Sequence, residues 1–507
     1  MVTEDHDDLK GRKNIMKMQL AEIAQALDIE PQNGWDDITV TSVSFDSRKI
    51  SAGALFVPLI DEKDGHQYVE SAKDNGAVAT LWQEDHPNTP TELPFLQVED
   101  SLKALQKLGS YYLQKINPRV VAITGSNGKT TTKDMVAGIL STQFHVKKTP
   151  ENFNNEIGVP MTCLTMEPNT EVLVVELGMD HFGQLDCLSR LVSPDVAVIT
   201  MIGEAHIEFF GTRAKIADAK MEILNGLKED GYFIYNGDEP LLLERAKDKT
   251  MPQLTFGNNE SNDIVATDIE GHENSTSFKV AAYPETPFNI PMIGTYNVNN
   301  ALAAISVGKI FQISADNMSQ ALKNFEITKN RAEWVTGKKG EKILSDVYNS
   351  NPTAARKVLE AFSQVTTSGK RIVVLGDMLE LGDQGAAMHA GLAQAIDPQK
   401  IASVYLCGDL MGSLADALRT KFSNDQVHHY KVDEKERLFN DLDAELSPND
   451  LVMLKGSHGI ALEKVLAMLI RDCIFVFKSA SILWLCVLER KTLQDRRRTI
   501  PTGCIVE

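Results

Sequence analysis

Uninterrupted apolar runs alternate with amphipathic stretches through the middle of this chain, between residues 119 and 202. The runs RVVAIT, EVLVVELG and DVAVITMI show no polar alternation, and Met135, Ile139 and Leu140 recur at helical spacing after the first of them. Strands that are apolar on both faces are typical of parallel sheets covered by helices. The pattern therefore predicts a doubly wound α/β unit.

The same pattern returns after Arg331, where IVVLGD, VYLCGD and LVMLKGS each end an apolar strand in a glycine and a polar residue. Loops at the carboxyl ends of parallel strands are where such sheets bind ligands. Before residue 118, shorter strands such as SVSFDSR and ALFVPL mix with short helices. We therefore expect three α/β domains: a smaller N-terminal one (16–117), a central P-loop ATPase-type parallel sheet (118–329) and a C-terminal Rossmann-like sheet (330–470).

The composition excludes some classes of protein. With 507 residues the chain can bury two to four cores. A net charge of -19 argues against a nucleic-acid partner, which would select a basic face. The six cysteines are scattered without metal-ligand spacing, which favours a reduced, cytoplasmic setting. No apolar run reaches the length of a membrane span, so we expect no stable membrane insertion.

Both ends of the chain look appended. The acidic residues 1–15 lack the apolar core of a signal peptide and are interpreted as a flexible lead or an alternative initiation region. Residues 471–507 contain half of all the cysteines, and their apolar part is interrupted by Lys478. One interpretation is a membrane-surface helix followed by a basic cluster. We favour a non-native or out-of-frame tail and expect it to be disordered.

The stretch AITGSNGKTTT (122–132) joins a predicted strand to a predicted helix through a glycine-rich turn. Free amides at the helix N-terminus point at phosphate, Lys129 neutralises it, and the Thr130 hydroxyl can ligate magnesium. The common phosphate loop has a glycine where this chain has Ile123, and the first glycine here is Gly125. A chance match to GKT is the alternative, but the strand, loop and helix together predict an ATP site.

Three further side chains are candidates for a metal centre. Glu176 ends one buried strand and His206 follows another, so both should lie at the carboxyl rim of the sheet, where they could hold Mg²⁺. A solvated or hydrogen-bonded role is the alternative for His206, and its position alone favours that role. Lys220 falls on the inward side of the apolar stripe in TRAKIADAKMEILNGL. Such a lysine either extends outward to solvent or has a specific partner, and the pattern does not choose between them.

Taken together, T-G-S-N-G-K-T-T, the ELG around Glu176, the EAH ending at His206 and the AKMEI around Lys220 resemble the Mur ligase family. The likeness covers nearly everything from Met16 to Leu469. In that family the lysine is carbamylated and helps bind a second magnesium ion. The resemblance therefore implies a carbamylated Lys220 that holds two Mg²⁺ together with Thr130, Glu176 and His206.

Four motifs narrow the resemblance within the family. KTPENFNNEIGVP, SDVYNSNP, VLGDMLELG and LKGSHGIALE are similar to those of the enzymes that add D-Ala-D-Ala to UDP-N-acetylmuramoyl-tripeptide. The enzyme that adds the third residue would instead show D-N-P-R, or its lysine-selective counterpart, and a G-K-G-H-E ending, and neither is found. Two positions depart from the pattern: Ser345 stands where Asp is common, and His458 where Arg is common.

The resemblance also implies an ATP site shared by two domains. The loop residues expected at the phosphates are Gly125, Ser126, Asn127, Gly128, Lys129, Thr130 and Thr131. Arg331 is expected to reach the phosphates from the C-terminal domain, and Asp346 to meet the ribose or stabilise domain closure. Asn297 and Asn300 resemble the adenine-side asparagines, with capping of a helix N-terminus as the alternative.

The remaining expected contacts concern the UDP-linked substrate. Asp46, Ser47 and Arg48 resemble the motif that helps hold the uridine diphosphate end, although a plain polar turn explains them equally well without the resemblance. Asn154 and Asn155 are expected to line the path of the muramoyl peptide.

The reaction implied is amide formation through an acyl phosphate, with Lys129, Glu176, His206 and Lys220 as the catalytic set. Because the ATP contacts come from two domains, we expect catalysis to require domain closure. Alternatives are another Mur-type ligase, adding the third residue or resembling folylpolyglutamate synthase, and a non-catalytic ATP-binding relative. The residues leave open lysine or diaminopimelate at the third position and D-alanyl-D-lactate as the added unit, and the family implies a monomer.

Overall fold

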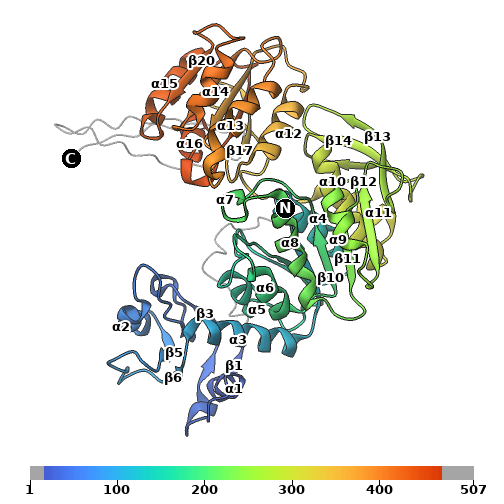
Figure 1. Ribbon diagram of the computed structural model, residues 1–507. Helices are drawn as coiled ribbons and strands as arrows, with labels where there is room; N and C mark the ends of the chain where they lie inside the picture. Colours follow the sequence, from blue (N-terminus) through green and yellow to red (C-terminus); the bar gives the residue numbers. More distant parts are fainter. Residues whose placement is uncertain (1–15, 471–507) are drawn as a thin grey trace, which may run out of the picture.

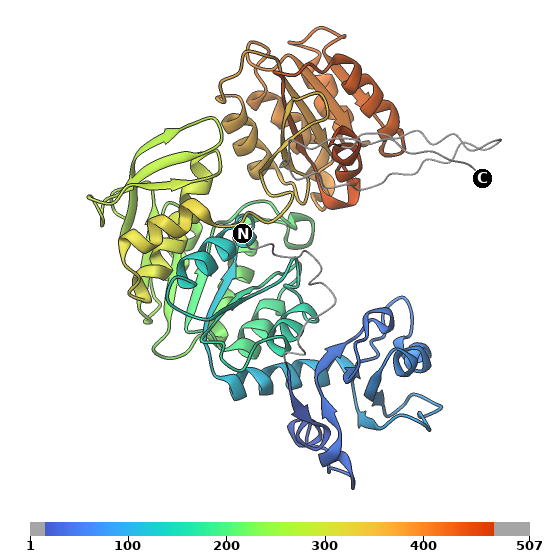
Figure 2. The same ribbon diagram turned by 180° about the vertical axis from the view of Figure 1, so that it is seen from behind.

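The computed structural model describes residues 16–470, so the expectations for residues 1–15 and 471–507 lie outside the described part. Three sheet-centred units follow one another along the chain, with the N-terminal unit at one end and the C-terminal unit at the other (Figures 1 and 2). Between residues 16 and 470, none of the helices combines the length and apolar character that crossing a membrane requires.

The N-terminal unit is built on a parallel sheet of strand order β3-β4-β5-β6, beside the antiparallel pair β1-β2. The strands are β1 (Met18–Gln19), β2 (Thr39–Val40), β3 (Ser42–Ser44), β4 (Ala54–Phe56), β5 (Ala77–Gln83) and β6 (Phe95–Val98), and the helices are α1 (Leu20–Ala26), α2 (Val69–Asp74) and α3 (Ser101–Ile116). Asp100 caps α3 by accepting from two of its first backbone amides. Although the sequence pattern assigned α3 to the N-terminal domain, this helix packs on α5 and α6 of the central unit and joins the two units.

The central unit is a nine-stranded sheet in the order β15-β14-β13-β12-β11-β10-β7-β9-β8. Its strands are β7 (Arg119–Thr124), β8 (Val146–Lys148), β9 (Val172–Glu176), β10 (Val196–Ile199), β11 (Tyr232–Asn236), β12 (Gln253–Gly257), β13 (Ile264–Gly271), β14 (Thr276–Val280) and β15 (Phe288–Ile290). The predicted parallel sheet is confirmed from β8 to β13. Strands β14 and β15 extend it by antiparallel pairing, which was not predicted. The short link between β13 and β14 permits only a hairpin.

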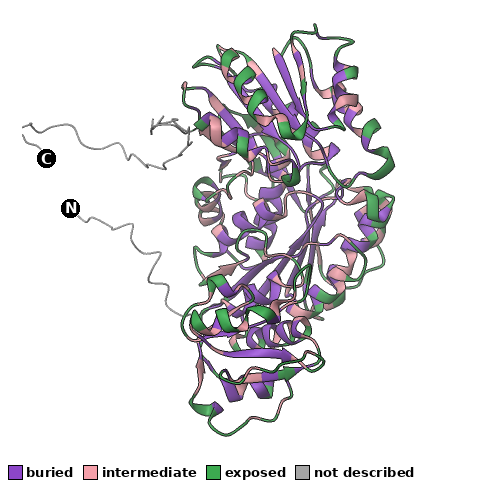
Figure 3. Cartoon of the chain, turned by 90° about the vertical axis from the view of Figure 1, so that its left-hand side faces the viewer, coloured by how far each residue is buried: buried purple, intermediate pink, exposed green. Residues whose placement is uncertain are grey.

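Successive residues of the central strands face opposite cores, as uninterrupted apolar runs require. Val121 and Ile123 pack with α4, α10 and α11, whereas Val120 and Ala122 pack with α5, α6 and α8. The sheet is accordingly buried while the outer helix faces are exposed (Figure 3). The helices of this unit are α4 (Lys129–Leu140), α5 (Gly158–Leu164), α6 (Gln184–Val192), α7 (Ile207–Phe210), α8 (Arg213–Met221), α9 (Pro240–Ala246), α10 (Thr295–Ile310) and α11 (Ala315–Asn324).

The C-terminal unit is a second doubly wound sheet, with strand order β16-β17-β21-β18-β19-β20. Its strands are β16 (Glu333–Thr336), β17 (Lys342–Asp346), β18 (Arg371–Gly376), β19 (Ser403–Cys407), β20 (Val427–Tyr430) and β21 (Leu451–Lys455). Its helices are α12 (Pro352–Phe362), α13 (Gly385–Gly391), α14 (Met411–Leu418), α15 (Lys435–Glu445) and α16 (Glu463–Ile470). The predicted parallel strands are confirmed, and β16 adds an antiparallel edge.

The contact between α3 and α5 depends on a glycine. A Cβ added to Gly109 on α3 would lie 2.7 Å from Cβ and 2.8 Å from Cα of Pro160, whereas one added to Gly138 on α4 would meet only Phe325 Cβ at 3.4 Å. We predict that Gly109→Ala lowers the free energy of unfolding by roughly 1–3 kcal/mol through overpacking. Gly138→Ala should be neutral or stabilising by up to about 1 kcal/mol, because alanine favours helix. Thermal denaturation of both variants tests this, and equal shifts would refute a close approach at Gly109.

Candidate functional site

The loop between β7 and α4 has the form of a phosphate cradle. Gly128 precedes α4 with φ 82°, and a side chain there would strike the amide of Asn300. Lys129 opens the helix, and its ammonium donates to the Gly125 carbonyl at 2.9 Å. Removal of water from around Lys129 lowers the pKa of its ammonium. The strand, glycine turn and helix therefore have the predicted arrangement.

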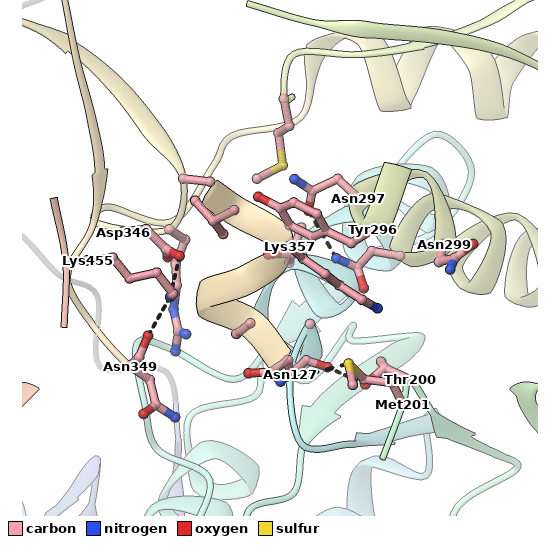
Figure 4. Close-up of a pocket in the computed structure, with 18 of the residues that line it drawn as sticks. Asn127, Thr200, Met201, Tyr296, Asn297, Asn299, Asp346, Asn349, Lys357 and Lys455 are labelled. Atoms are coloured by element: carbon pink, nitrogen blue, oxygen red, sulfur yellow. Dashed lines mark hydrogen bonds and ion pairs between the residues drawn. The ribbon is translucent and has the colours of Figure 1, made fainter. Parts of the chain in front are cut away.

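A pocket rich in amides, here called the asparagine pocket, lies between the central and C-terminal units (Figure 4). Residues from both units line it: Asn127, Gly128, Thr131, Thr200, Met201, Asn236, Met292, Tyr296, Asn297, Asn299, Asn300, Arg331, Ala332, Asp346, Asn349, Ala354, Lys357, Val358 and Lys455. The phosphate loop forms one wall and α10 another. The pocket thus joins the loop to the predicted adenine-side asparagines.

Asn297 and Asn300 do not cap α10, because the residue at the cap position is Gly294. Asn297 instead donates to the Ile293 carbonyl at 2.9 Å, and Asn300 donates to the Asn297 side-chain oxygen at 3.1 Å. The Asn300 side-chain oxygen in turn accepts from the Thr132 hydroxyl at 3.4 Å. The capping alternative is therefore wrong, and the two amides form a buried chain between α10 and the first turn of α4.

The C-terminal wall of this pocket carries charged residues. Lys455 is buried and donates to the Asp346 carboxylate at 2.6 Å and to the Asn349 carbonyl at 2.8 Å. Lys357, half-buried on α12, has a pKa lowered chiefly by burial. The sequence interpretation included Asp346 but missed both lysines. Lys455 ends the apolar strand in LVMLKGS, so the rule that singled out Glu176 could have found it.

Arg331 lines the asparagine pocket and also a second pocket beside it. It donates to the Thr130 hydroxyl at 3.3 Å, and its guanidinium carbon lies 3.9 Å above the Tyr348 ring. Within the described part of the chain, the buried Nε of Arg331 has no hydrogen-bond partner, and neither has the buried side-chain oxygen of Asn299. Buried polar atoms without partners are rare in folded proteins, so these two are available to a polar ligand.

The second pocket, here called the carboxylate pocket, shares Asn127, Gly128, Arg331 and Asn349 with the first. Besides the shared Asn127, Gly128 and Arg331, it brings together seven further predicted site residues: Ser126, Lys129, Thr130, Asn154, Asn155, Glu176 and His206. Its other lining residues are Glu156, Gly178, Met179, Asp180, Gln184 and Tyr348.

At the centre of this pocket, both oxygens of a buried carboxylate are held. Glu176 Oε2 accepts from the Thr130 hydroxyl at 2.9 Å, and Oε1 accepts from the Asn154 amide at 2.8 Å. Glu176 ends β9 and Thr130 lies in the first turn of α4, so neighbouring strands of the sheet supply the pair. A carboxylate and a hydroxyl with His206 on the same pocket form a donor set that fits a divalent cation such as Mg²⁺.

His206 directly precedes α7 and has a left-handed backbone, with φ 63°. Its Nδ1 lies 2.5 Å from Oε2 of Glu380, which belongs to the C-terminal unit. His206 is thus hydrogen-bonded, as the alternative interpretation held, and it also lines the carboxylate pocket. Nε2 is the ring nitrogen that this contact leaves available.

Two further contacts join the site loops to the C-terminal unit. The amide side chains of Asn127 and Asn351 exchange hydrogen bonds at 2.8 and 3.2 Å. Glu204, two residues before His206, accepts from the backbone amide of Thr353 at 3.1 Å and from its hydroxyl at 2.9 Å. The sequence interpretation included Asn127 but missed Asn351, Glu204 and Thr353, although SDVYNSNP contains Asn351 and EAH contains Glu204.

Lys220 is buried on α8, as the apolar stripe predicted, and does not extend to solvent. Between residues 16 and 470, its ammonium makes no hydrogen bond or ion pair. Burial lowers the pKa of Lys220 well below the ordinary value of 10.5, and the neighbouring charge of Lys129 lowers it further. The amine is therefore held toward its neutral form, next to another cation.

The three N-terminal candidates lie apart from both pockets. Asp46 caps the 3₁₀ turn Ser47–Lys49 by accepting from the Arg48 backbone amide at 3.1 Å, and it pairs with the Arg48 side chain at 2.9 Å. This contact holds the pKa of Asp46 below its ordinary value. The structure therefore describes a polar turn here and does not bring it to the ATP-type site.

One group of metal-type side chains among residues 16–470 lies outside the pockets. His66 Nδ1 and His86 Nε2 contact the two oxygens of Asp64 at 2.7 and 2.8 Å. The two rings stack 4.1 Å apart at an interplanar angle of 11°. Nitrogen lone pairs lie in the ring planes, so two parallel rings do not direct them at one ion. In this group, Asp64 joins His66 and His86 through hydrogen bonds within the N-terminal unit.

The two departures from the family pattern are accommodated in the C-terminal unit. The buried Ser345 donates from its hydroxyl to the Asn330 side chain at 3.0 Å. His458 stacks on Tyr348, with ring centroids 5.6 Å apart. His458 therefore supports the ring on which Arg331 lies.

The buried Lys220 generates a stability prediction. In CO₂-depleted buffer, Lys220→Met should raise the free energy of unfolding by roughly 1–3 kcal/mol, because it removes a desolvated amine. The pKa of Lys220 is lower in the folded protein than in the unfolded chain. In the wild type, the charged Lys220 therefore lowers the free energy of unfolding by its full amount below the pKa that Lys220 has in the folded protein. This loss disappears as the pH rises to the pKa of lysine in the unfolded chain. Chemical denaturation at pH about 7 and about 9.5 should show the gap narrowing; a destabilised Met variant would contradict this account.

Three family models match this chain: the Mur ligase middle domain over residues 123–308, the Mur ligase glutamate ligase domain over 330–458, and the Mur ligase family catalytic domain over 39–112. Among solved structures, a crystal structure of MurF from Acinetobacter baumannii is similar with a TM-score of 0.79 at 28% identity, covering 90% of this chain and 99% of that one. MurF ligase from Thermotoga maritima in complex with ADP is similar with a TM-score of 0.73 at 29% identity, covering 84% of this chain and 96% of that one.

Curated relatives give the same picture over nearly their whole length. The UDP-N-acetylmuramoyl-tripeptide--D-alanyl-D-alanine ligase of Bacillus subtilis is 41% identical over 454 residues, which is 89% of this chain and 98% of the relative. The enzyme of the same name from Escherichia coli is 31% identical, again over 89% of this chain and 98% of the relative. This chain belongs to the Mur ligase family.

Proposed function

We propose that this protein is an ATP-dependent ligase that joins D-alanyl-D-alanine to UDP-N-acetylmuramoyl-tripeptide, a step in the synthesis of peptidoglycan precursors. The contact between Thr130 of the phosphate loop and the buried Glu176, beneath Arg331, is the observation that carries it. The names of the relatives from Bacillus subtilis and Escherichia coli support the choice of substrates.

The nucleotide occupies the asparagine pocket, with its phosphates on the loop. The adenosine lies against Asn297 and Asn300, and Asp346 meets the ribose or stabilises closure. The phosphate oxygens accept hydrogen bonds from the backbone amides of the loop residues Gly125, Ser126, Asn127, Gly128, Lys129, Thr130 and Thr131. Arg331 approaches them from the C-terminal unit, and its unpartnered Nε supports this role. The complex of the Thermotoga relative with ADP supports nucleotide binding by this fold.

Thr130, Glu176, His206 and a carbamylated Lys220 would hold two Mg²⁺ ions. When bound, these ions neutralise the charge that develops on the transferring phosphoryl group. The oxygen donors of Thr130 and Glu176 are already in contact at 2.9 Å, so they fit a hard cation without rearrangement of the loop. The Asn154 amide, which donates to Glu176 Oε1, orients the carboxylate.

The surroundings of Lys220 favour its carbamylation. CO₂ adds to a neutral amine, and burial beside Lys129 holds the pKa of Lys220 low enough to supply that form. Addition of CO₂ to the neutral amine releases a proton and leaves an anionic carbamate, which the Lys129 ammonium attracts. The buried amine without a partner thereby gains both a ligand role and a favourable charge contact.

The reaction proceeds in two displacements. A carboxylate oxygen of the tripeptide attacks the γ-phosphorus of ATP and ADP leaves, which produces an acyl phosphate. The amine of the dipeptide then attacks the acyl carbon, phosphate leaves, and the nitrogen loses a proton. Lys129 and Arg331 stabilise charge on the phosphoryl oxygens, and the contacts of Asn127 and Glu204 with the C-terminal unit close the site against water.

The remaining assignments complete the proposal. Asn154 and Asn155 line the path of the muramoyl peptide, while Asp46, Ser47 and Arg48 hold the uridine diphosphate end once the N-terminal unit moves toward the pockets. The three functional domains span residues 16–117, 118–329 and 330–470, and the protein works as a cytoplasmic monomer. A panel of UDP-tripeptides with lysine or diaminopimelate, and of D-Ala-D-Ala and D-Ala-D-Lac, identifies the natural pair.

Phosphate release tests the proposed reaction. We predict that release from ATP rises at least about 100-fold only when both UDP-tripeptide and D-Ala-D-Ala are present, because both reactants must be positioned before turnover. Malachite green detection measures the phosphate, and mass spectrometry measures the pentapeptide product. Lys129→Met is the control that removes the phosphate contact. Release indifferent to the dipeptide would refute this ligase, and a response to glutamate would favour the folylpolyglutamate synthase-like alternative.

The carbamate has its own test. Lys220→Ala should lose activity by about 100-fold or more, as expected for loss of a group that stabilises the transition state. A short carboxylic acid such as acetate or propionate should restore part of the activity by supplying the missing carboxylate. Thr130→Ala, which lacks a different metal ligand, should gain nothing from the acid. Wild-type rates in Lys220→Ala, or equal rescue of the control, would exclude the carbamate.

A further inference from the structure

Glu380, in the loop that follows β18, contacts the start of α7. The Glu380 side chain accepts from His206 Nδ1 at 2.5 Å, and the Glu380 backbone carbonyl accepts from the Glu208 amide at 3.1 Å. Glu380 has a left-handed backbone, with φ 59°. One residue of the C-terminal unit thus holds two points on the central unit.

The contact determines how the His206 ring presents itself. Nδ1 faces a carboxylate and therefore carries the proton, which leaves Nε2 as the ring atom with a free lone pair. Asp180 is the other carboxylate near the ring, and it pairs with His181 at 2.7 Å. Glu380 alone is in hydrogen-bond contact with the His206 ring among residues 16–470.

The same segment is held a second time by the C-terminal unit. Glu204 lies two residues before His206, and its carboxylate accepts from the backbone amide and hydroxyl of Thr353 in the first turn of α12. The loop after β10 is therefore fixed by one contact at Glu204 and another at His206. Both partners belong to the C-terminal unit, so the loop has this arrangement only when the two units are together.

We propose that Glu380 is a positioning residue, which orients His206 so that Nε2 faces the carboxylate pocket and completes one metal site only when the C-terminal domain is closed. A carboxylate behind a histidine ligand is a common way to set its tautomer and raise its basicity. The inference rests on the proposed function for the presence of metal at His206. It adds a link between that metal and domain closure, which by reciprocity requires metal binding to favour the closed arrangement.

Direct metal binding tests this proposal without turnover. Mn²⁺ is titrated into the full-length protein with a non-hydrolysable ATP analogue, and bound ions are measured by electron paramagnetic resonance. We expect two ions in the wild type. Glu380→Ala should weaken one of them about 10–100-fold and leave the other unchanged. Glu380→Gln, whose amide oxygen still accepts from Nδ1, should retain more of the affinity than Glu380→Ala.

Asp383→Ala is the matched control. Asp383 is an exposed carboxylate three residues further along the chain, and within residues 16–470 it forms no hydrogen bond or ion pair with His206. Asp383→Ala should bind both ions as the wild type does. A double-mutant cycle provides a check on folding: once His206→Ala has removed the ligand, Glu380→Ala should have no further effect on Mn²⁺. Small-angle scattering should show that Mn²⁺ with the analogue closes the wild type but closes Glu380→Ala less.

The outcomes separate the two levels of inference. Mn²⁺ affinities in Glu380→Ala equal to those in Asp383→Ala would overturn the positioning role, and so would equal loss in the Ala and Gln variants. Additive losses in Glu380→Ala and His206→Ala would also overturn it. If His206→Ala binds Mn²⁺ as tightly as the wild type does, the metal ligands of the proposed function are refuted instead.

Discussion

Strands β7, β9 and β10 are direct neighbours in one parallel sheet, and this adjacency places the phosphate loop, Glu176 and the loop of His206 at a single edge. The register aligns Ile123 with Glu176 and Thr124 with Ile199, so the three strands end almost level. The Thr130–Glu176 hydrogen bond is a result of that alignment. Every other feature of the site, from the Asn154 contact to the docking of the C-terminal unit, is built around this edge.

The cost of the arrangement is electrostatic. Lys129, Lys220 and Lys357 all have pKa values lowered chiefly by burial. Cations held away from water destabilise the ligand-free fold unless anions compensate, and Lys220 has no such anion within the described part of the chain. Phosphates, carboxylates and a carbamate are the groups that can compensate. In the proposed function, these buried cations lower the free energy of unfolding of the ligand-free protein and raise its affinity for anionic ligands.

Patterns within a single element predicted much of this site, whereas contacts between elements did not. Glu176 and Lys220 were found because a polar residue at the end of an apolar strand, or on the apolar face of a helix, stands out locally. Glu380 gives no such signal, since its partner His206 is distant in the chain and the pair forms only when two units dock. The boundary predicted at residue 117 shows the same limit, because position in the sequence does not reveal that helix α3 packs against the central unit. The sequence interpretation assigned no strands to residues 264–290, so it missed the antiparallel hairpin β13–β14.

The two pockets share the loop residues Asn127 and Gly128 and the C-terminal residues Arg331 and Asn349, so both depend on how the C-terminal unit docks on the central unit. Arg331 touches Thr130 on one side and lies on Tyr348 on the other, and His458 supports Tyr348. A displacement of the C-terminal unit would therefore withdraw Arg331 from the phosphate loop, separate Asn351 from Asn127 and release His206 from Glu380 together. All of these contacts join the C-terminal unit to the central unit, so in the proposed function the docking of one sheet on the edge of the other couples nucleotide binding, metal binding and domain closure.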